Sequence, residues 1–262
     1  MAIKIGDYEV RLTNTEEERR QVRQLRYKVF CEEEGAIATK KQKDLHEEYD
    51  KYDAYAKYLA LFHKGKIIGT YRIIDRNAAE KMGGFYSESE FDISKIKNSG
   101  KNIVEVSRAC IASEYRDKKT PLRLLLMGLN QYIENNKIDI LFGMASWNGT
   151  NPLESANAIS YLYHNHLTPS NLRAKVDKTK LSKSIDSKLT QMDMLPKDSV
   201  DSASAREEMP PLLKGYLDFN AKVGNGVFID KKFNSYEVLI VLQTHNINPM
   251  YKKFFTSRTE RE

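Results

Sequence analysis

The stretch Asn102–Ile133 reads NIVEVSRACIASEYRDKKTPLRLLLMGLNQYI, and the rest of the chain is interpreted around it. Its first half is rich in β-branched and apolar residues, which predicts a strand, yet it carries Glu105 and Arg108. Its second half has leucines at helical spacing behind Thr120-Pro121, which predicts a helix. Because a buried carboxylate is costly unless it is paired or protonated, the two charges form either a structural ion pair or part of a functional site.

A polar, basic turn, Glu114–Lys119, connects this strand to this helix. The free N–H groups and the dipole of a helix N-terminus both point at such a turn. The arrangement therefore predicts a site for an anionic ligand or partner.

The composition limits the classes of function. The 262 residues carry 42 Lys and Arg against 36 Asp and Glu, a formal charge of +6, which favours acidic partners. The sequence contains no basic and aromatic motif of a nucleic-acid module. No apolar run approaches the roughly 18 residues of a membrane span, and the first residues contain no apolar core of a signal peptide. The cysteines Cys31 and Cys110 lack metal or redox spacing, so a reduced cytoplasm is expected.

Other charged residues lie where apolar ones are expected. Arg26 falls inside the apolar stripe of a helix that follows a first strand, Tyr8–Thr13. Arg72 lies in the second strand of a predicted hairpin. Between these elements, the polar segment from Glu34 to Asp53 lacks any apolar period and is predicted to be a loop, in which Asp44 is solvated.

The second half of the chain alternates strands and helices. Strands are predicted at 138–146, 227–230 and 237–242, and helices from about 153 and about 210. The Lys/Ser-rich residues 171–209 are predicted to be an insert. His164 and His166 are two residues apart and would not share a helix face, so no metal site is predicted. The alternation predicts one α/β domain, 1–262, with a mixed β-sheet flanked by helices.

The unusual residues form an ordered set, which is Arg26, Phe30, Asp50, Asp53, Arg72, Phe85, Glu105 and Arg108. This set resembles the acyl-homoserine-lactone synthases, acyltransferases of the GNAT superfamily. Nearly the whole chain is similar to another branch, the ornithine N-acyltransferases or N-acyl amino acid synthases. That likeness runs through the segments EVSRAC from Glu105, FGMAS from Phe142, YLYHNHL from Tyr161 and VGNG from Val223.

The resemblance implies a GNAT-like fold and an acyl transfer without a bound cofactor or metal. A 3-hydroxyacyl group would move from the phosphopantetheine of acyl carrier protein to the α-amino group of ornithine. Because the product is a lipid, peripheral contact with the anionic inner face of the cytoplasmic membrane is compatible with this activity. The partners expected are acyl carrier protein and the amino acid, with no nucleic acid.

The basic turn supports a protein-bound donor. Ordinary acetyltransferases of this superfamily bind the coenzyme A diphosphate with a glycine-rich turn, but Arg116–Pro121 contains no glycine to let the backbone approach. Side-chain charge suits the surface of an acidic carrier protein. The residues expected there are Arg116, Lys118, Lys119 and Arg123.

The reaction needs a base for the amine and a donor for the oxyanion. Glu105 is the predicted base, in a setting where burial raises its pKa and Arg108 lowers it. Residues three apart on a regular strand face opposite sides, so these two converge only if a bulge separates them. Asp50 and Asp53 would either hold cationic groups of the substrate or pair with the buried arginines.

Two residues of the second half are further candidates for the substrate site. Trp147 would line the acyl channel or belong to the core, and Glu154 is a carboxylate for the second ammonium of ornithine. Three alternatives remain open at this point. They are N-acylation of glycine, serine or glutamine, a coenzyme-A-dependent acetyltransferase, and a non-enzymatic basic adaptor at anionic membranes.

Overall fold

The computed structural model describes residues 2–247, which group into two compact units. The first comprises residues 2–85 and 104–138, and the second comprises residues 86–103 and 139–247. The sequence-based prediction of one domain stays a prediction, and its residues 1 and 248–262 lie outside the described part.

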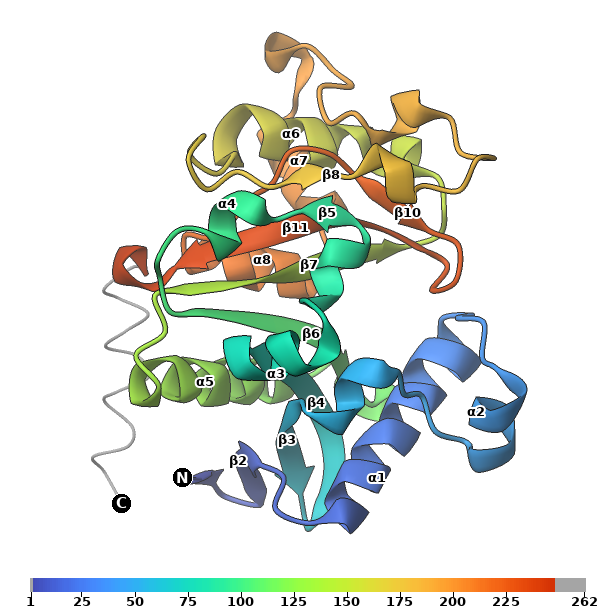
Figure 1. The fold of residues 1–262 in the computed structure, drawn as a ribbon, viewed down its shortest axis with the longest axis vertical. Coiled ribbons are helices and arrows are strands. Elements are labelled where there is room, and N and C mark those ends of the chain that lie inside the picture. The colour runs from blue at the N-terminus through green and yellow to red at the C-terminus, as the bar shows by residue number, and fades with distance from the viewer. Residues whose placement is uncertain (1, 248–262) are drawn as a thin grey trace. The chain divides into compact units, whose positions relative to one another are not determined.

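The first unit is an antiparallel sheet with helices on it (Figure 1). Its strands, in sheet order, are β1 (Ala2–Ile5), β2 (Tyr8–Leu12), β3 (Lys57–His63), β4 (Lys66–Asp75) and β6 (Ile103–Ile111). Its helices are α1 (Glu16–Arg26), the π-helix η1 (Tyr27–Glu33), α2 (Lys40–Leu45), the 3₁₀-helix η2 (Lys51–Ala54), α3 (Arg76–Met82), the 3₁₀-helix η4 (Ser113–Tyr115) and α5 (Lys119–Asn135).

Helices α1 and α5 cover opposite faces of this sheet. Tyr58 of β3 faces the arginines of α1, whose Arg19 and Arg26 lie over its ring. The next residue, Leu59, lies against Gly128 of α5. Since successive side chains of a strand point to opposite faces, the sheet separates a polar layer under α1 from an apolar layer under α5.

Local signals explain several of these elements. Thr15 caps α1 by accepting a hydrogen bond from the Glu18 N–H at 3.1 Å, and three glutamates follow in the first turn. The β3–β4 hairpin turns at Lys64-Gly65, both with positive φ, as a two-residue hairpin requires. Gly83 ends α3 in the left-handed conformation. The strand predicted from Tyr8, the helix that follows it and the hairpin are confirmed.

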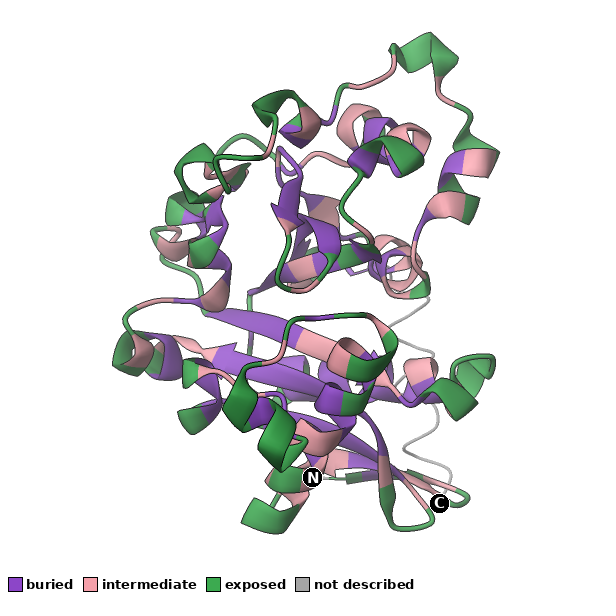
Figure 2. Ribbon diagram, turned by 90° about the vertical axis from the view of Figure 1, so that its right-hand side faces the viewer, coloured by how far each residue is buried: buried purple, intermediate pink, exposed green. Residues whose placement is uncertain are grey.

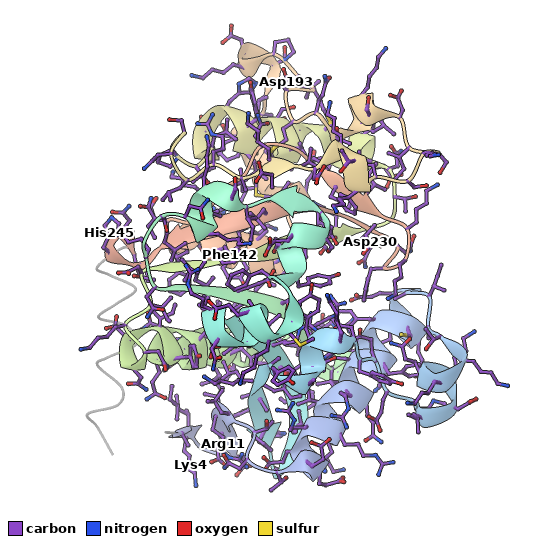
Figure 3. The ribbon with its side chains drawn as sticks, in the orientation of Figure 1. Lys4, Arg11, Phe142, Asp193, Asp230 and His245 are labelled. Carbon is purple, nitrogen blue, oxygen red and sulfur yellow. The ribbon has the colours of Figure 1, made fainter. Side chains whose placement is uncertain are left out.

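The second unit contains a long antiparallel pair, β7 with β11, and shorter elements around it. Figure 2 shows its central strands largely in purple, and Phe142 of β7, labelled in Figure 3, is fully buried. Its strands are β5 (Phe91–Asp92), β7 (Ile140–Asn148), β8 (Lys175–Val176), β9 (Lys222–Val223), β10 (Phe228–Asp230) and β11 (Ser235–Gln243). Its α-helices are α4 (Ser94–Lys97), α6 (Ala156–His166), α7 (Ser202–Glu208) and α8 (Pro211–Asp218). Its 3₁₀-helices are η3 (Tyr86–Ser89), η5 (Pro152–Ser155), η6 (Lys178–Lys180), η7 (Ser187–Thr190), η8 (Lys197–Ser199) and η9 (Thr244–Asn246).

The Lys/Ser-rich residues 171–209 are folded against the rest of this unit. They contain buried apolar side chains at Leu172, Met192 and Met209, and Thr190 is 1% exposed. The segment is therefore anchored to the second unit at several points along its length.

Candidate active site

Arg26 is completely buried at the end of α1. Its Nε donates to Glu48 Oε2 at 2.6 Å, and its two terminal nitrogens donate to the two carboxylate oxygens of Asp53 at 2.7 and 3.0 Å. This bidentate geometry holds the guanidinium plane in one orientation. Arg26 can thus be buried in the apolar stripe of α1 because two buried carboxylates pair with its guanidinium group.

Arg72 is also completely buried, in the middle of β4. Its Nη1 donates to Asp50 Oδ1 at 2.6 Å and to Asp53 Oδ1 at 3.3 Å, and its Nε donates to Ser107 Oγ at 3.0 Å. Arg72 therefore links the segment before β3 to strand β6.

Arg108 lies at a bulge in β6. Ser107 is opposite Arg72, but the next paired residue, Cys110, is opposite Thr70, so Arg108 and Ala109 together face Tyr71. Arg108 has φ +53°, in the left-handed region that disfavours residues with a side chain. The sequence predicts a bulge between Glu105 and Arg108, and the structure places one at Arg108 and Ala109, after a regular pairing of Glu105 to Ser107 with β4.

The bulge brings the Arg108 side chain to the same carboxylates. Its Nε donates to Glu48 Oε1 and its Nη2 to Asp50 Oδ2, both at 3.3 Å. Neighbouring residues Ser107 and Arg108 thus both reach the cluster, which a regular strand would prevent because it would place them on opposite faces. We call these six charged side chains the arginine–carboxylate cluster, which consists of Arg26, Glu48, Asp50, Asp53, Arg72 and Arg108.

The prediction of a loop for 34–53 is wrong, although Asp44 is exposed as expected. The segment contains α2 and η2, and Glu47 and Glu48 are buried. Asp50 and Asp53 form a capping box, in which Asp53 accepts from the Asp50 N–H and Asp50 accepts from the Tyr52 N–H, both at 2.8 Å. The buried acidic residues Glu47, Glu48 and Asp53 have partners inside the protein, whereas most other polar residues of the segment are exposed.

Glu48 is the member of the cluster that the sequence reasoning missed. It is 3% exposed and bridges two arginines. A signal was present, because Glu48, Asp50 and Asp53 follow one another within six residues, but an acidic run alone does not distinguish a solvated segment from a buried one.

The cluster contains three guanidinium groups and three carboxylates. For Asp53, burial alone would raise the pKa, but Arg26 and Arg72 hold it well below its ordinary value. For Asp50, burial is likewise outweighed by Arg72 and Arg108, so its pKa is also lowered. The hydroxyl of Tyr58 donates to Asp53 at 2.8 Å, and burial together with this carboxylate raises the pKa of the tyrosine. Of the two roles left open for the aspartates, pairing with arginines is the one observed.

Glu105 is completely buried on β6, opposite Ile74. It is two residues before Ser107 and therefore shares the face of the sheet on which Ser107 meets Arg72. A buried carboxylate on the face that carries the arginine–carboxylate cluster fits the role of base that the sequence predicted.

The two phenylalanines of the ordered set contact residues that neighbour the arginine–carboxylate cluster in the chain. Phe30 of η1 packs against an apolar group that includes Leu25, Val29 and Cys110. Phe85 is 2% exposed, and its carbonyl accepts a hydrogen bond from the Tyr52 hydroxyl at 3.3 Å. Phe85 is thus part of the core of the first unit.

Comparisons with known proteins agree with this geometry. An acetyltransferase (GNAT) domain matches residues 25–126. An L-ornithine N(alpha)-acyltransferase of Brucella abortus is 34% identical over 98% of this chain and 92% of its own length. The chain belongs to the L-ornithine N(alpha)-acyltransferase family. It is therefore an N-acyltransferase, and the predicted GNAT fold class is confirmed.

Two further comparisons extend this result. A family member from Rhodobacter capsulatus is 30% identical over 99% of both chains. Among solved structures, FeeM, an N-acyl amino acid synthase from uncultured soil microbes, aligns over 91% of each chain with a TM-score of 0.51 and 13% identity, which supports the fold.

The basic turn before α5 is only partly free for a partner. Arg116 donates to Glu33 at 2.5 Å and to the Ile111 carbonyl at 2.9 Å, so its charge is used within the unit. Lys118 and Lys119 are exposed, and Arg123 is half-buried in the first turns of α5. The two lysines are the stronger candidates for contact with a carrier protein.

The remaining predicted residues lie in the second unit. Trp147 is buried, stacks on Tyr236 with ring centroids 5.5 Å apart and donates to the Glu208 carbonyl at 2.9 Å. Glu154 is exposed and accepts from Asn151 at 3.2 Å. Their roles toward the acyl chain and the acceptor stay predictions.

The second unit also holds the histidines and a group of carboxylates. His164 contacts the Leu195 carbonyl at 2.9 Å, and burial lowers the pKa of His166 to about 4. One carboxylate oxygen each from Glu90, Asp230 and Glu237 lies within 4.8 Å of the others, and Figure 3 labels Asp230. Within residues 2–247, no helix is both long enough and apolar enough to cross a membrane.

Proposed function

We propose that this N-acyltransferase moves a 3-hydroxyacyl group from acyl carrier protein to the α-amino group of ornithine. The acceptor is supported by four relatives named L-ornithine N(alpha)-acyltransferase, each matched over 96–99% of this chain. The protein-bound donor is supported by the glycine-free turn at 116–121 and its exposed Lys118 and Lys119.

The proposed chemistry uses Glu105 as the general base. An ammonium cannot attack a carbonyl, so the α-ammonium of the acceptor transfers a proton to the Glu105 carboxylate, directly or through a water molecule. The neutral amine then attacks the thioester carbonyl, a C–N bond forms, the C–S bond breaks, and the thiol leaves on the phosphopantetheine of the carrier protein. A backbone N–H freed by the bulge at Arg108 to Cys110 is the proposed donor to the oxyanion.

The arginine–carboxylate cluster keeps this face of the sheet fixed. Its carboxylates form ion pairs with guanidinium groups, so we assign them to the support of the sheet and not to binding of the substrate's ammonium groups. Because the three positive and three negative charges balance, the cluster can be buried at moderate cost. Its contribution is to hold β6 in the bulged conformation that carries Glu105 and Arg108.

The observation that carries the proposal is the near-full-length match to the family together with a fully buried Glu105 on the cluster's face of the sheet. The partners follow as acyl carrier protein and ornithine, without a resident cofactor or metal, in the cytoplasm and peripheral to its membrane.

The proposal is tested by supplying purified protein with 3-hydroxyacyl carrier protein and equal concentrations of ornithine, lysine, glutamine, serine and glycine. Mass spectrometry identifies the products, and ornithine is expected to be acylated preferentially. Preferred acylation of glycine would contradict the acceptor assignment and leave the acyltransferase intact. Equal use of acyl-coenzyme A would contradict the carrier-protein donor.

The donor surface has its own test. Charge reversal at Lys118 and Lys119 should slow association with the carrier protein, and the defect should shrink as salt increases. The matched control reverses Lys180 and Lys183, two exposed lysines of the second unit. Equal defects in both variants would show that total charge matters and the turn does not.

A further inference from the structure

A second basic surface lies on residues 177–189, which we call the lysine loop. Lys178, Lys180, Lys183 and Lys188 are all exposed. None of these ammonium groups forms an ion pair with a carboxylate of residues 2–247. The two acidic side chains of the loop serve as caps instead: one accepts from the Thr179 N–H at 3.0 Å and the other from the Lys188 N–H at 2.9 Å. The loop has four lysines against these two aspartates and therefore carries a net positive charge of +2.

The ends of the lysine loop are fixed to the second unit. Before the loop, the Val176 N–H donates to the Asn225 carbonyl at 3.0 Å. After it, the Val227 N–H donates to the carbonyl of Thr190, which is 1% exposed. Gly226 makes this approach possible, because it has φ +116° and a Cβ there would lie 2.4 Å from Val176 Cγ1. The lysines are thus displayed on an anchored loop.

Aliphatic side chains alternate with the lysines. Leu181, Ile185 and Leu189 recur every four residues and are half-buried. Further positive charge adjoins the loop, because Lys231 Nζ donates to Ser184 Oγ at 2.6 Å. The surface thus combines several ammonium groups with partly exposed aliphatic carbon.

We propose that the lysine loop is a docking surface for a bilayer that contains anionic phospholipids. Between 178 and 188 the cations are all lysines. Lysine is a hydrated point charge, whereas arginine is preferred for fixed, bidentate recognition of carboxylates. A row of lysines with aliphatic neighbours fits a bilayer, because the ammonium groups match the diffuse negative potential of the headgroups and the aliphatic carbon matches the apolar layer beneath them.

The reason for docking at a bilayer depends on the proposed function, because the proposed product, an acylated amino acid, is an amphiphile that partitions into a bilayer. Binding itself is independent of catalysis. It can therefore fail while acyl transfer between soluble substrates persists, and the reverse also holds.

The test is co-sedimentation of the full chain with vesicles of phosphatidylcholine that contain phosphatidylglycerol as about a third of the lipid. Binding is expected to these vesicles, to weaken with salt, and to be lost with phosphatidylcholine alone. Replacement of Lys178, Lys180 and Lys183 by glutamine should lower the partition coefficient about fivefold per lysine, or about a hundredfold in total.

The control replaces Lys4, Lys64 and Lys66, three exposed lysines of the first unit, by glutamine and changes the net charge equally. It should bind almost as well as the unchanged protein. Equal losses in both triple variants, or equal binding to neutral vesicles, would overturn the proposal. So would a loop variant that loses affinity for acyl carrier protein but keeps its affinity for vesicles.

Discussion

Replacing Glu48 by glutamine tests whether the arginine–carboxylate cluster supports catalysis through Arg108. The change keeps the shape of the side chain and removes one negative charge that is shared by Arg26 and Arg108. The Glu48 side chain is 4% exposed, and those of Arg26 and Arg108 are 0% and 8% exposed. Water therefore cannot replace the lost charge.

The magnitude follows from this burial. Leaving a buried charge without its partner costs about 3–5 kcal/mol, and the amide oxygen of glutamine still accepts one hydrogen bond, so we expect about 3 kcal/mol. For a chain of this size the melting temperature should fall by roughly 6–12 °C. Turnover, measured well below that temperature, should fall at least about tenfold, because Arg108 loses one of its two carboxylates and the bulge is less firmly held.

Glu47→Gln is a matched control from the adjacent position. Glu47 is also buried and also bridges two arginines, Arg20 and Arg23, but within residues 2–247 its side chain forms no ion pair or hydrogen bond with a member of the cluster. The Arg20 side chain is 52% exposed, and Arg23 keeps a second partner in Glu16. We expect a loss of about 1 kcal/mol and nearly unchanged turnover. Similar losses of turnover in the two variants, assayed by product formation with folding checked by circular dichroism, would refute the reasoning.

Three other predictions concern chemistry, pH and packing. Glu105→Gln should stay folded and lower turnover by about a hundredfold or more, and near-normal turnover would remove Glu105 as the base. The lowered pKa of Asp53 means that its ion pairs stabilise the fold above the unfolded pKa of about 3.9, and that this stability is lost as the pH falls below it. Asp53→Asn should therefore flatten the acid side of a urea-unfolding series, and an unchanged pH profile would contradict this. Gly226→Ala should lower the free energy of unfolding by about 2 kcal/mol or more, because the new Cβ would collide with Val176. The control is Gly83→Ala, which should cost about 1 kcal/mol, because Gly83 has φ +80° but no atom lies within 4 Å of the position of its Cβ. Equal costs would show that the contact with Val176 is unimportant.

The sequence alone indicated several of the strands and helices and the charged residues that are out of place in them. Hydrophobic spacing, Thr15 as a cap, Gly83 as a helix end and the Lys64-Gly65 turn are local signals, so they could be read without partners. Charged residues on buried faces, such as Arg26 and Arg72, were equally visible because they break a local pattern. The same reasoning predicted a bulge near Arg108, since the face rule leaves no other way for the side chains to converge.

Only the tertiary structure decided how these charges are paired. Whether an acidic segment is solvated or buried depends on what packs against it, and the arginines that bury Glu48, Asp50 and Asp53 come from α1, β4 and β6, 19 to 60 residues away in the chain. Pairing of this kind is long-range and leaves no periodic trace in the sequence. The same holds for Arg116, whose charge suggested a partner surface until its contact with Glu33 showed that it is held within the protein.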